Sequence, residues 1–225
     1  MSEEGSYGLW WLVIANSAIF IFFAFSFIKP KTKTDWRSLG AFSAFVVALF
    51  TEMYGFPLTI YLFSGWLTDN YPAIDFFAHD NGHLLHTLLG FEGNPHWDPL
   101  HMASNIFIII GFFTLSSAWS VLHQAQKDKA LASTGLYARC RHPQYIAFIM
   151  IMLGFLLQWP TVVTLMMFPI LVFVYIRLAK REEQVAILEF GDEYRKYMNI
   201  TPSWFPLLHI PKSSMSETDN QGEES

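Results

Sequence analysis

The chain has 225 residues, of which 52% are hydrophobic and 15% are charged, and its formal net charge is −5. Soluble domains carry about 25% charged residues, so this deficit excludes an ordinary soluble domain and favours an integral membrane protein. The acidic balance and the lack of a basic block argue against a nucleic-acid partner. The single cysteine, Cys140, excludes an internal disulfide, and no neighbouring feature activates it as a nucleophile.

Five apolar stretches are long enough to be read as membrane helices. They cover residues 8–28, 38–66, 100–122, 143–158 and 161–179. The first is interpreted as an uncleaved anchor, because no basic segment precedes it. The second is overlong and should be kinked at Pro57, which removes a backbone donor and clashes with the preceding turn. The sequence therefore predicts an all-α integral membrane protein with about five transmembrane helices.

The basic residues predict how these helices are oriented. All 14 Lys and Arg residues lie between the first and second stretches, between the third and fourth, or at and beyond the end of the fifth. The 33 residues from Leu67 to Pro99 contain none. The positive-inside rule then places the N-terminus outside and the C-terminus in the cytoplasm. The predicted location is the cytoplasmic membrane of a prokaryote.

Three parts of the chain differ in character. Residues 1–122 hold the first three membrane helices together with a polar outer segment at 67–99. Residues 123–211 hold a C-terminal helical hairpin and an interfacial helix. Residues 212–225 are polar and acidic, and we expect this tail to be disordered because it has almost no apolar side chains to bury.

The sequence GLYARCRHPQY at 135–145 brings basic groups to the start of the fourth helix. Pro143 fixes its own φ and pushes His142 into an extended conformation, so the helix should begin at the proline. Arg141 and His142 then flank a helix N-terminus, where free amide groups and the helix dipole favour an anion. The alternative is that both are ordinary basic residues at a cytoplasmic boundary.

The fifth helix should return to the same membrane face. The segment 143–180 has 38 residues, which is about one bilayer crossing for each leg at about 1.5 Å per residue. Glu182 and Glu183 are therefore predicted to lie beside Arg141 and His142, because acidic groups at this depth are costly without a partner. Opposed cationic and acidic walls suit a zwitterionic ligand that carries hydroxyls. A solvated helix with intrahelical ion pairs is the alternative.

Aromatic residues follow the hairpin. Tyr194 and Tyr197 are three apart on one helical face and are expected at the membrane interface, where tyrosine is favoured. Trp204 and Phe205 stand between prolines and are interpreted as an aromatic clasp folding back onto the membrane. Packing rather than chemistry is the expected role of these four residues.

Polar residues also occur in the outer half. His79, His83 and His86 share one face if their segment is helical, and imidazole suits zinc, copper or nickel. No zinc motif is present, so packing is the preferred interpretation and a metal-handling membrane protein is the non-enzymatic alternative. Glu52, near the kink, is a functional candidate because an ionisable group within the bilayer is costly. It is predicted to line a substrate cavity with Tyr54, to form hydrogen bonds to the broken helix, or to pair with an outer histidine.

The ordered set GLY…RHPQY, EE, FGDEYRKY and P..FP, within residues 129–206, resembles the isoprenylcysteine carboxyl methyltransferase and phospholipid methyltransferase superfamily of membrane enzymes. The resemblance implies S-adenosyl-L-methionine as cofactor, with its site on the C-terminal hairpin. The cofactor-binding residues that it implies are Lys129, Ala130, Leu131, Ala132, Tyr137, His142, Pro143, Gln144, Tyr145 and Glu182. It also implies a substrate-side arginine, for which Arg177 and Arg181 are the candidates. Arg141, Glu183 and Arg177 are the catalytic candidates, and Arg181 joins the residues expected at the substrate cavity.

The chain departs from the family pattern after Tyr145: the family's glycine is absent, because Ile146-Ala147-Phe148 follows. The first two-thirds of the chain align with no eukaryotic prenyl-protein enzyme, so a carboxylate, a thiol and an amine all stay open as methyl acceptors. The expected partners are the lipid bilayer and a small or lipid-like acceptor. The alternative enzyme is an NADPH-dependent membrane reductase of the sterol reductase type. That group has an Arg-Asp pair where this chain has Glu182 and Glu183.

Overall fold

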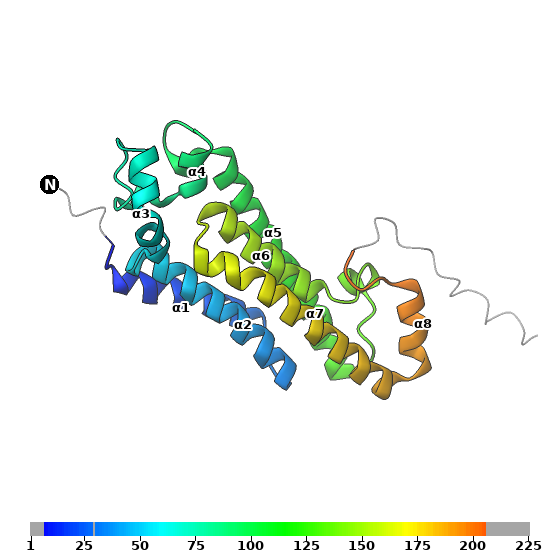
Figure 1. The fold of residues 1–225 in the computed structure, drawn as a ribbon. Coiled ribbons are helices and arrows are strands. Elements are labelled where there is room, and N and C mark those ends of the chain that lie inside the picture. The colour runs from blue at the N-terminus through cyan, green and yellow to red at the C-terminus, as the bar shows by residue number, and fades with distance from the viewer. Residues whose placement is uncertain (1–6, 29, 206–225) are drawn as a thin grey trace, which may run out of the picture.

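The computed structural model describes residues 7–28 and 30–205, which form helices and no strand. Five helices run along the length of the molecule (Figure 1). They are α1 (Trp10–Phe27), α2 (Lys33–Phe50), α5 (Pro99–Asp128), α6 (Pro143–Gln158) and α7 (Val162–Phe190). Shorter helices lie at the two ends: α3 (Leu58–Asn70) and α4 (Leu84–Leu88) at one, and α8 (Asp192–Ile200) at the other. The predicted all-α fold is confirmed, and the tail at 212–225 lies outside the described residues.

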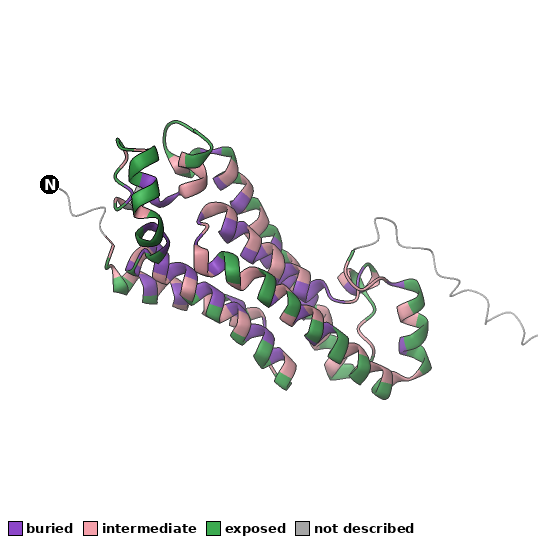
Figure 2. Ribbon diagram, in the orientation of Figure 1, coloured by how far each residue is buried: buried purple, intermediate pink, exposed green. Residues whose placement is uncertain are grey.

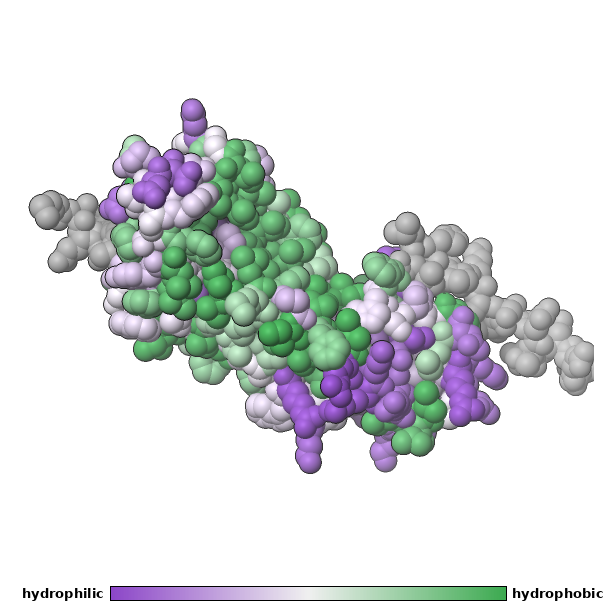
Figure 3. Space-filling view, in the orientation of Figure 1, coloured by the Kyte–Doolittle hydropathy of each residue, from purple (hydrophilic) through white to green (hydrophobic). Residues whose placement is uncertain are grey.

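Four of these helices are long and apolar enough to cross a membrane: α1, α2 with the turn that continues it, α5 and α7. The fifth, α6, is apolar but has 16 residues, or about 24 Å at 1.5 Å per residue. On the face seen in Figure 3, hydrophobic residues cover the middle of the molecule and hydrophilic residues gather towards its ends. These features support a multi-pass membrane protein, and the orientation of its termini stays a prediction.

The second predicted stretch, 38–66, is not a single kinked helix. Helix α2 gives way to a π-helical turn, η1 (Thr51–Gly55), and the backbone becomes extended at Phe56. A separate helix, α3, follows Pro57. The proline has no N–H to donate and its ring clashes with the preceding turn, so the helix breaks here rather than bends.

Helix α7 extends well beyond its predicted end at residue 179. It begins after Thr161, which forms a capping box with Thr164, and it continues to Phe190. Gly191 ends it with a φ of +56°, a backbone conformation that glycine adopts without steric cost. The sequence KREEQ therefore lies within the helix, and its side chains have fixed directions.

Helices α5 and α6 approach each other closely at two glycines. A Cβ at Gly111 would lie 2.5 Å from Cγ1 of Ile151, and one at Gly154 would lie 2.9 Å from the carbonyl oxygen of Ser104. Small residues allow membrane helices to pack this tightly. Figure 2 shows the buried residues gathered on the inward faces of these helices and of α2. The pairing fixes where α5 ends relative to the start of α6, and so positions the connecting segment that carries much of the site.

Only part of the predicted aromatic clasp is present. The Trp204 ring packs against the bundle, with its centroid 5.7 Å from that of His142 and 6.4 Å from that of Tyr145. Phe205 is 87% exposed and packs little against the protein, so its predicted contact with the membrane stays a prediction.

Candidate cofactor site

The two ends of the α6–α7 hairpin meet at the end of the molecule that carries α8 (Figure 1). Gln144, in the first turn of α6, donates from Nε2 to Oε2 of Glu182 in α7 over 3.2 Å. Tyr145 donates from its hydroxyl to Oε1 of the same carboxylate over 2.7 Å. His142 Nε2 lies 3.0 Å from Oε1 of Glu183. The predicted return of both glutamates to the start of α6 is confirmed.

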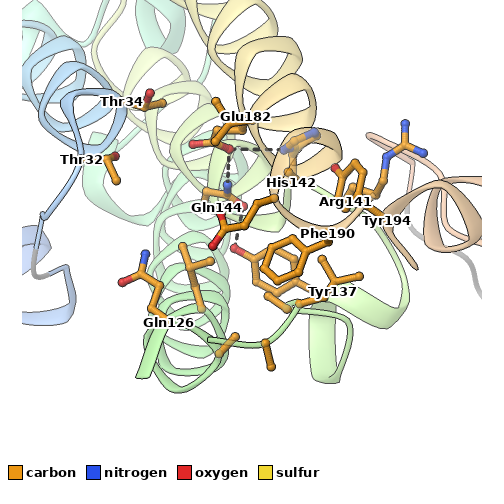
Figure 4. Close-up of a pocket in the computed structure, with 18 of the residues that line it drawn as sticks. Thr32, Thr34, Gln126, Tyr137, Arg141, His142, Gln144, Glu182, Phe190 and Tyr194 are labelled. Atoms are coloured by element: carbon orange, nitrogen blue, oxygen red, sulfur yellow. Dashed lines mark hydrogen bonds and ion pairs between the residues drawn. The ribbon is translucent and has the colours of Figure 1, made fainter. Parts of the chain in front are cut away.

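A cavity of about 370 Å³ opens at this meeting point (Figure 4). Its volume falls within the range of small-molecule sites, which is about 300–1,000 Å³. The polar and titratable lining residues are Thr32, Thr34, Asp35, Gln126, Lys129, Tyr137, Arg141, His142, Gln144, Glu182, Glu189 and Tyr194. The other lining residues are Leu122, Ala125, Ala130, Leu131, Ala132, Val185, Ala186 and Phe190. The cavity is therefore lined by both polar groups and apolar patches, and the apolar patches suit a flat ring.

Eight of the ten predicted cofactor-binding residues line this cavity. They are Lys129, Ala130, Leu131, Ala132, Tyr137, His142, Gln144 and Glu182. The other two lie behind its wall: Pro143 begins α6, and Tyr145 is buried and holds the Glu182 carboxylate. The structure thus gathers the predicted set around one space.

The segment after α5 offers backbone donors to the cavity. Lys129 ends the helix in a left-handed conformation, with φ +51°, and the Ala130 amide donates to the carbonyl of Ala125 over 3.0 Å. The amides of Leu131 and Ala132, which also line the cavity, donate to no group within the part of the chain that the structure describes. Backbone N–H groups need a partner when they are covered, so these two suit an acceptor group on a bound ligand.

A chain of hydrogen bonds orients the Glu182 carboxylate (Figure 4). The Tyr137 hydroxyl donates to Oε1 of Gln144 over 3.0 Å, which leaves Nε2 of Gln144 to donate to Glu182. Burial, with the charge of Glu182 adding to it, raises the pKa of Tyr137, so its phenol stays a proton donor. The Tyr197 hydroxyl in turn donates to the Tyr137 carbonyl over 2.6 Å, which ties α8 to this wall.

Arg141 is bound mainly by groups of the protein itself. Its Nε donates to Oε1 of Glu183 over 3.0 Å, and its Nη1 donates to the carbonyls of Met198 and Thr201, both at 3.0 Å. Glu183 does not line the cavity. The anion predicted at the start of α6 is therefore the carboxylate of Glu183 in the chain itself. Arg141 joins the end of α8 to the hairpin. A direct catalytic role for these two residues stays a prediction.

His142 lies between the two glutamates. Its Nε2 is 3.0 Å from Oε1 of Glu183, and its Nδ1 is 3.7 Å from Oε2 of Glu182. Burial lowers the pKa of His142, but hydrogen bonds and charge from the two carboxylates outweigh burial, so its pKa lies above the usual 6.5. Burial also raises the pKa of the nearby Cys140 thiol, to about 11, so this thiol is protonated at neutral pH.

Arg177 and Arg181 lie outside the cavity. Together with Arg37, Val174 and Leu178 they line a second hollow, of about 280 Å³, between α2 and α7. The Arg177 guanidinium also lies 5.8 Å from the centroid of the Phe173 ring. The role of substrate-side arginine therefore stays a prediction for both residues.

Glu52 and Tyr54 lie in η1, away from the cavity, and neither lines it. Oε2 of Glu52 accepts hydrogen bonds from the Thr59 amide over 2.9 Å and from its hydroxyl over 2.6 Å. The same hydroxyl oxygen accepts from the Val162 amide over 2.8 Å. Of the roles predicted for Glu52, bonding the broken helix is the one that its contacts show.

The outer histidines do not share one helical face. Residues 79–82 form a 3₁₀ turn that ends before α4, and the side chain of His79 lies outside the described part. Nδ1 of His83 lies 3.1 Å from the carbonyl oxygen of Gln158, and Nδ1 of His86 lies 2.8 Å from Oδ2 of Asp98. Among the side chains that the structure describes, no three from His, Cys, Asp and Glu are grouped to hold a metal ion.

Several lining residues were missed by the sequence interpretation. Thr32, Thr34 and Asp35 come from the start of α2, and Glu189 and Phe190 come from the last turn of α7, beyond its predicted end. The only local signal at the first group is a capping box between Thr32 and Asp35, which marks a helix start and no ligand. Packing of distant helices brings these residues to the site.

The fold and the cavity define a multi-helix membrane protein with a cofactor-sized site on its C-terminal hairpin. Residues 99–187 match the model of the isoprenylcysteine carboxyl methyltransferase (ICMT) family. This match covers α5, α6 and most of α7, including Glu182, and ends before α8. The predicted resemblance to the membrane methyltransferases of this family is confirmed.

Curated relatives carry the corresponding name. The chain is 29% identical over 112 residues to the protein-S-isoprenylcysteine O-methyltransferase of Schizosaccharomyces pombe, covering 45% of this chain and 48% of the relative. The proteins of the same name from Rattus norvegicus and Mus musculus are each 26% identical, over 44% and 43% of this chain and 36% and 35% of theirs. The chain thus spans about half or less of the length of the relatives it matches. No solved structure matches it significantly.

Proposed function

We propose that this chain transfers a methyl group from S-adenosyl-L-methionine to a lipophilic acceptor at the membrane surface. The observation that carries the proposal is the Glu182 carboxylate, which Gln144 and Tyr145 hold at the wall of a cavity of about 370 Å³. The match of residues 99–187 to the ICMT family, whose members use this cofactor, supports it independently.

The residues present fit the cofactor. A carboxylate accepts hydrogen bonds from hydroxyl and ammonium groups, so Glu182 suits the polar part of S-adenosyl-L-methionine. The unused amides of Leu131 and Ala132 suit a ligand carboxylate, and the apolar wall near Phe190 suits an adenine ring. Bound here, the cofactor would supply an activated methyl group on its sulfonium, for transfer to the acceptor's nucleophile with release of S-adenosylhomocysteine.

The protein's part in such a transfer is to position the reactants and to exclude water. Effective concentrations for well-oriented partners are large, and the sulfonium is already activated, so no strong base is needed. In this structure the Glu183 carboxylate pairs with both His142 and Arg141. We assign these three residues to holding the cavity wall and the segment after α8. Arg141 also lines the cavity.

The names of the relatives favour the carboxylate of an isoprenylated cysteine as acceptor. A lipophilic thiol or amine stays an alternative for this chain, because the matched segment leaves α1 to α4 outside. The positive-inside prediction places the cavity at the cytoplasmic face, where a soluble cofactor has direct access.

The test is calorimetry of the purified protein with S-adenosylhomocysteine. Wild type should bind it, and Glu182→Ala should bind at least about tenfold more weakly, because a hydrogen bond to a charged group contributes about 1.5–3 kcal/mol. Glu193→Ala is the matched control, because Glu193 is exposed on α8 and lines no part of the cavity. Binding of NADPH instead of S-adenosylhomocysteine would overturn the proposal in favour of a reductase. Membranes given radiolabelled methyl donor would then identify the acceptor fraction.

A further inference from the structure

The second hollow, which we call the arginine hollow, lies between α2 and α7 at the same end of the molecule as the cofactor cavity. Arg37 of α2 meets Arg177 and Arg181 of α7 around a space of about 280 Å³. All three side chains are exposed, and none is paired with a carboxylate within the described part of the chain. Three neighbouring cations repel one another, so the arrangement is favourable when an anion lies between them.

On the N-terminal side of Arg177, α7 carries a strip of exposed apolar side chains. Met166, Ile170 and Phe173 are 65%, 59% and 57% exposed, and their spacing places them on one helical face with Arg177 and Arg181. This face is thus apolar through the middle of the helix and basic near its end. Figure 3 shows the same change from hydrophobic to hydrophilic along the molecule. This face therefore matches a membrane lipid, which has an apolar tail and a polar headgroup.

The neighbouring face of α2 carries small side chains. Gly40, Ala44 and Val47 follow Arg37 along an exposed face, and a Cβ at Gly40 would meet no atom within 4 Å. The hydroxyl of Tyr175 donates to the carbonyl of Ser38 over 3.3 Å, which ties the two helices together at the level of the hollow. The small side chains leave room beside the α7 strip for an extended hydrocarbon chain.

We propose that the arginine hollow binds the phosphate headgroup of an anionic phospholipid of the surrounding bilayer, with an acyl chain along the strip. Guanidinium groups bond phosphate oxygens in pairs, and basic pockets between membrane helices recognise anionic headgroups. Exposed Trp36 beside Arg37 is the residue type favoured at this depth. The site is distinct from the cofactor cavity, since no residue lines both.

The test measures lipid retention by native mass spectrometry of the full chain in detergent, titrated with phosphatidylglycerol or phosphatidylcholine. Wild type should retain phosphatidylglycerol more tightly. The triple variant Arg37→Gln, Arg177→Gln, Arg181→Gln should lose affinity on the order of 100-fold, given the usual contribution of each basic residue near an anionic headgroup. The matched control removes three exposed cations at the same end, Lys180, Arg195 and Lys196, which do not line the hollow. It should retain the lipid like wild type.

Other outcomes overturn the proposal. Equal retention of the two lipids, or equal loss in the control variant, would show attraction to the basic end as a whole. Full competition by glycerol phosphate would assign the hollow to a soluble phosphate. The triple variant could instead lose only the binding of N-acetyl-S-farnesyl-L-cysteine, an isoprenylated cysteine, and keep that of phosphatidylglycerol. That result would assign the hollow to the methyl acceptor.

Binding of S-adenosylhomocysteine shows in each case that a variant is folded, and keeps failure of this proposal separate from failure of the proposed function. If the triple variant does not fold, Arg37→Gln alone replaces it. This single change should weaken phosphatidylglycerol retention several-fold, and unchanged retention would overturn the proposal.

Discussion

Arg141 and Glu183 form an ion pair that fastens the segment after α8 to the α6–α7 hairpin, with Nη2 of the arginine 2.9 Å from Oε1 of the glutamate. Both side chains are largely buried, at 10% and 16% exposed. The same arginine holds the carbonyls of Met198 and Thr201, and its Nη2 also contacts the Ser203 hydroxyl. The Arg141 side chain thus connects the start of α6 with the last described residues of the chain.

Replacing Arg141 with alanine should therefore release the C-terminal segment. Removing one partner of a buried pair leaves the other charge unpaired and costs about 3–5 kcal/mol. We expect a lower melting temperature and faster hydrogen exchange in residues 192–204, measured by mass spectrometry. Arg195→Ala is the control, because its pair with Asp192 is exposed and such pairs contribute about 1 kcal/mol or less. Unchanged exchange in Arg141→Ala would show that this C-terminal segment is held by packing alone.

The hairpin itself could be predicted because its signals are local. Pro143 marks the start of α6, and the apolar lengths on either side of the turn at Trp159 set the return of Glu182. The carbonyl partners of Arg141, on Met198 and Thr201, could not be predicted, since backbone carbonyls carry no sequence signature. Phe190 and Glu189 were missed because α7 continues through a charged stretch that looked like a boundary.

Stability should fall as pH rises through the raised pKa of His142. Burial lowers that pKa, but the two neighbouring carboxylates outweigh burial and raise it above the usual 6.5. The folded protein therefore binds this proton more tightly than the unfolded chain, so the stabilisation is complete below pH 6.5 and is lost above the folded-state pKa. Melting temperatures between pH 5.5 and 9 should decline across this window in wild type. His142→Gln should flatten the decline, and an identical pH profile in the variant would refute the assignment.

The Tyr145 hydroxyl should matter for cofactor affinity without touching the cavity. It donates to Oε1 of Glu182 over 2.7 Å, and hydrogen bonds to charged groups contribute about 1.5–3 kcal/mol. Tyr145→Phe should weaken S-adenosylhomocysteine binding about tenfold by calorimetry, because the carboxylate loses a fixed orientation. Tyr175→Phe is the matched control, since that hydroxyl is buried and donates to Ser38. Equal affinities in the two variants would remove Tyr145 from the positioning of Glu182.

At Glu52 the sequence left three roles open, and the structure distinguishes between them. An ionisable residue in an apolar stretch is a functional candidate on cost alone, and the sequence does not say which polar group satisfies it. The break after η1 exposes the amide of Thr59, and that amide and its hydroxyl satisfy Oε2 of Glu52. The contacts of Glu52 thus support the predicted role of bonding the broken helix.

Glu52→Ala should accordingly reduce stability and leave cofactor affinity intact. The substitution removes the acceptor for two hydrogen bonds at the start of α3, and an unsatisfied buried amide costs about 1–3 kcal/mol. Glu52→Gln keeps an oxygen acceptor and should recover most of the loss. Melting temperature and S-adenosylhomocysteine calorimetry on all three proteins separate the two roles. If Glu52→Gln instead melted like wild type but lost methylation of its acceptor, the carboxylate would belong to a substrate cavity after all, as one sequence interpretation predicted.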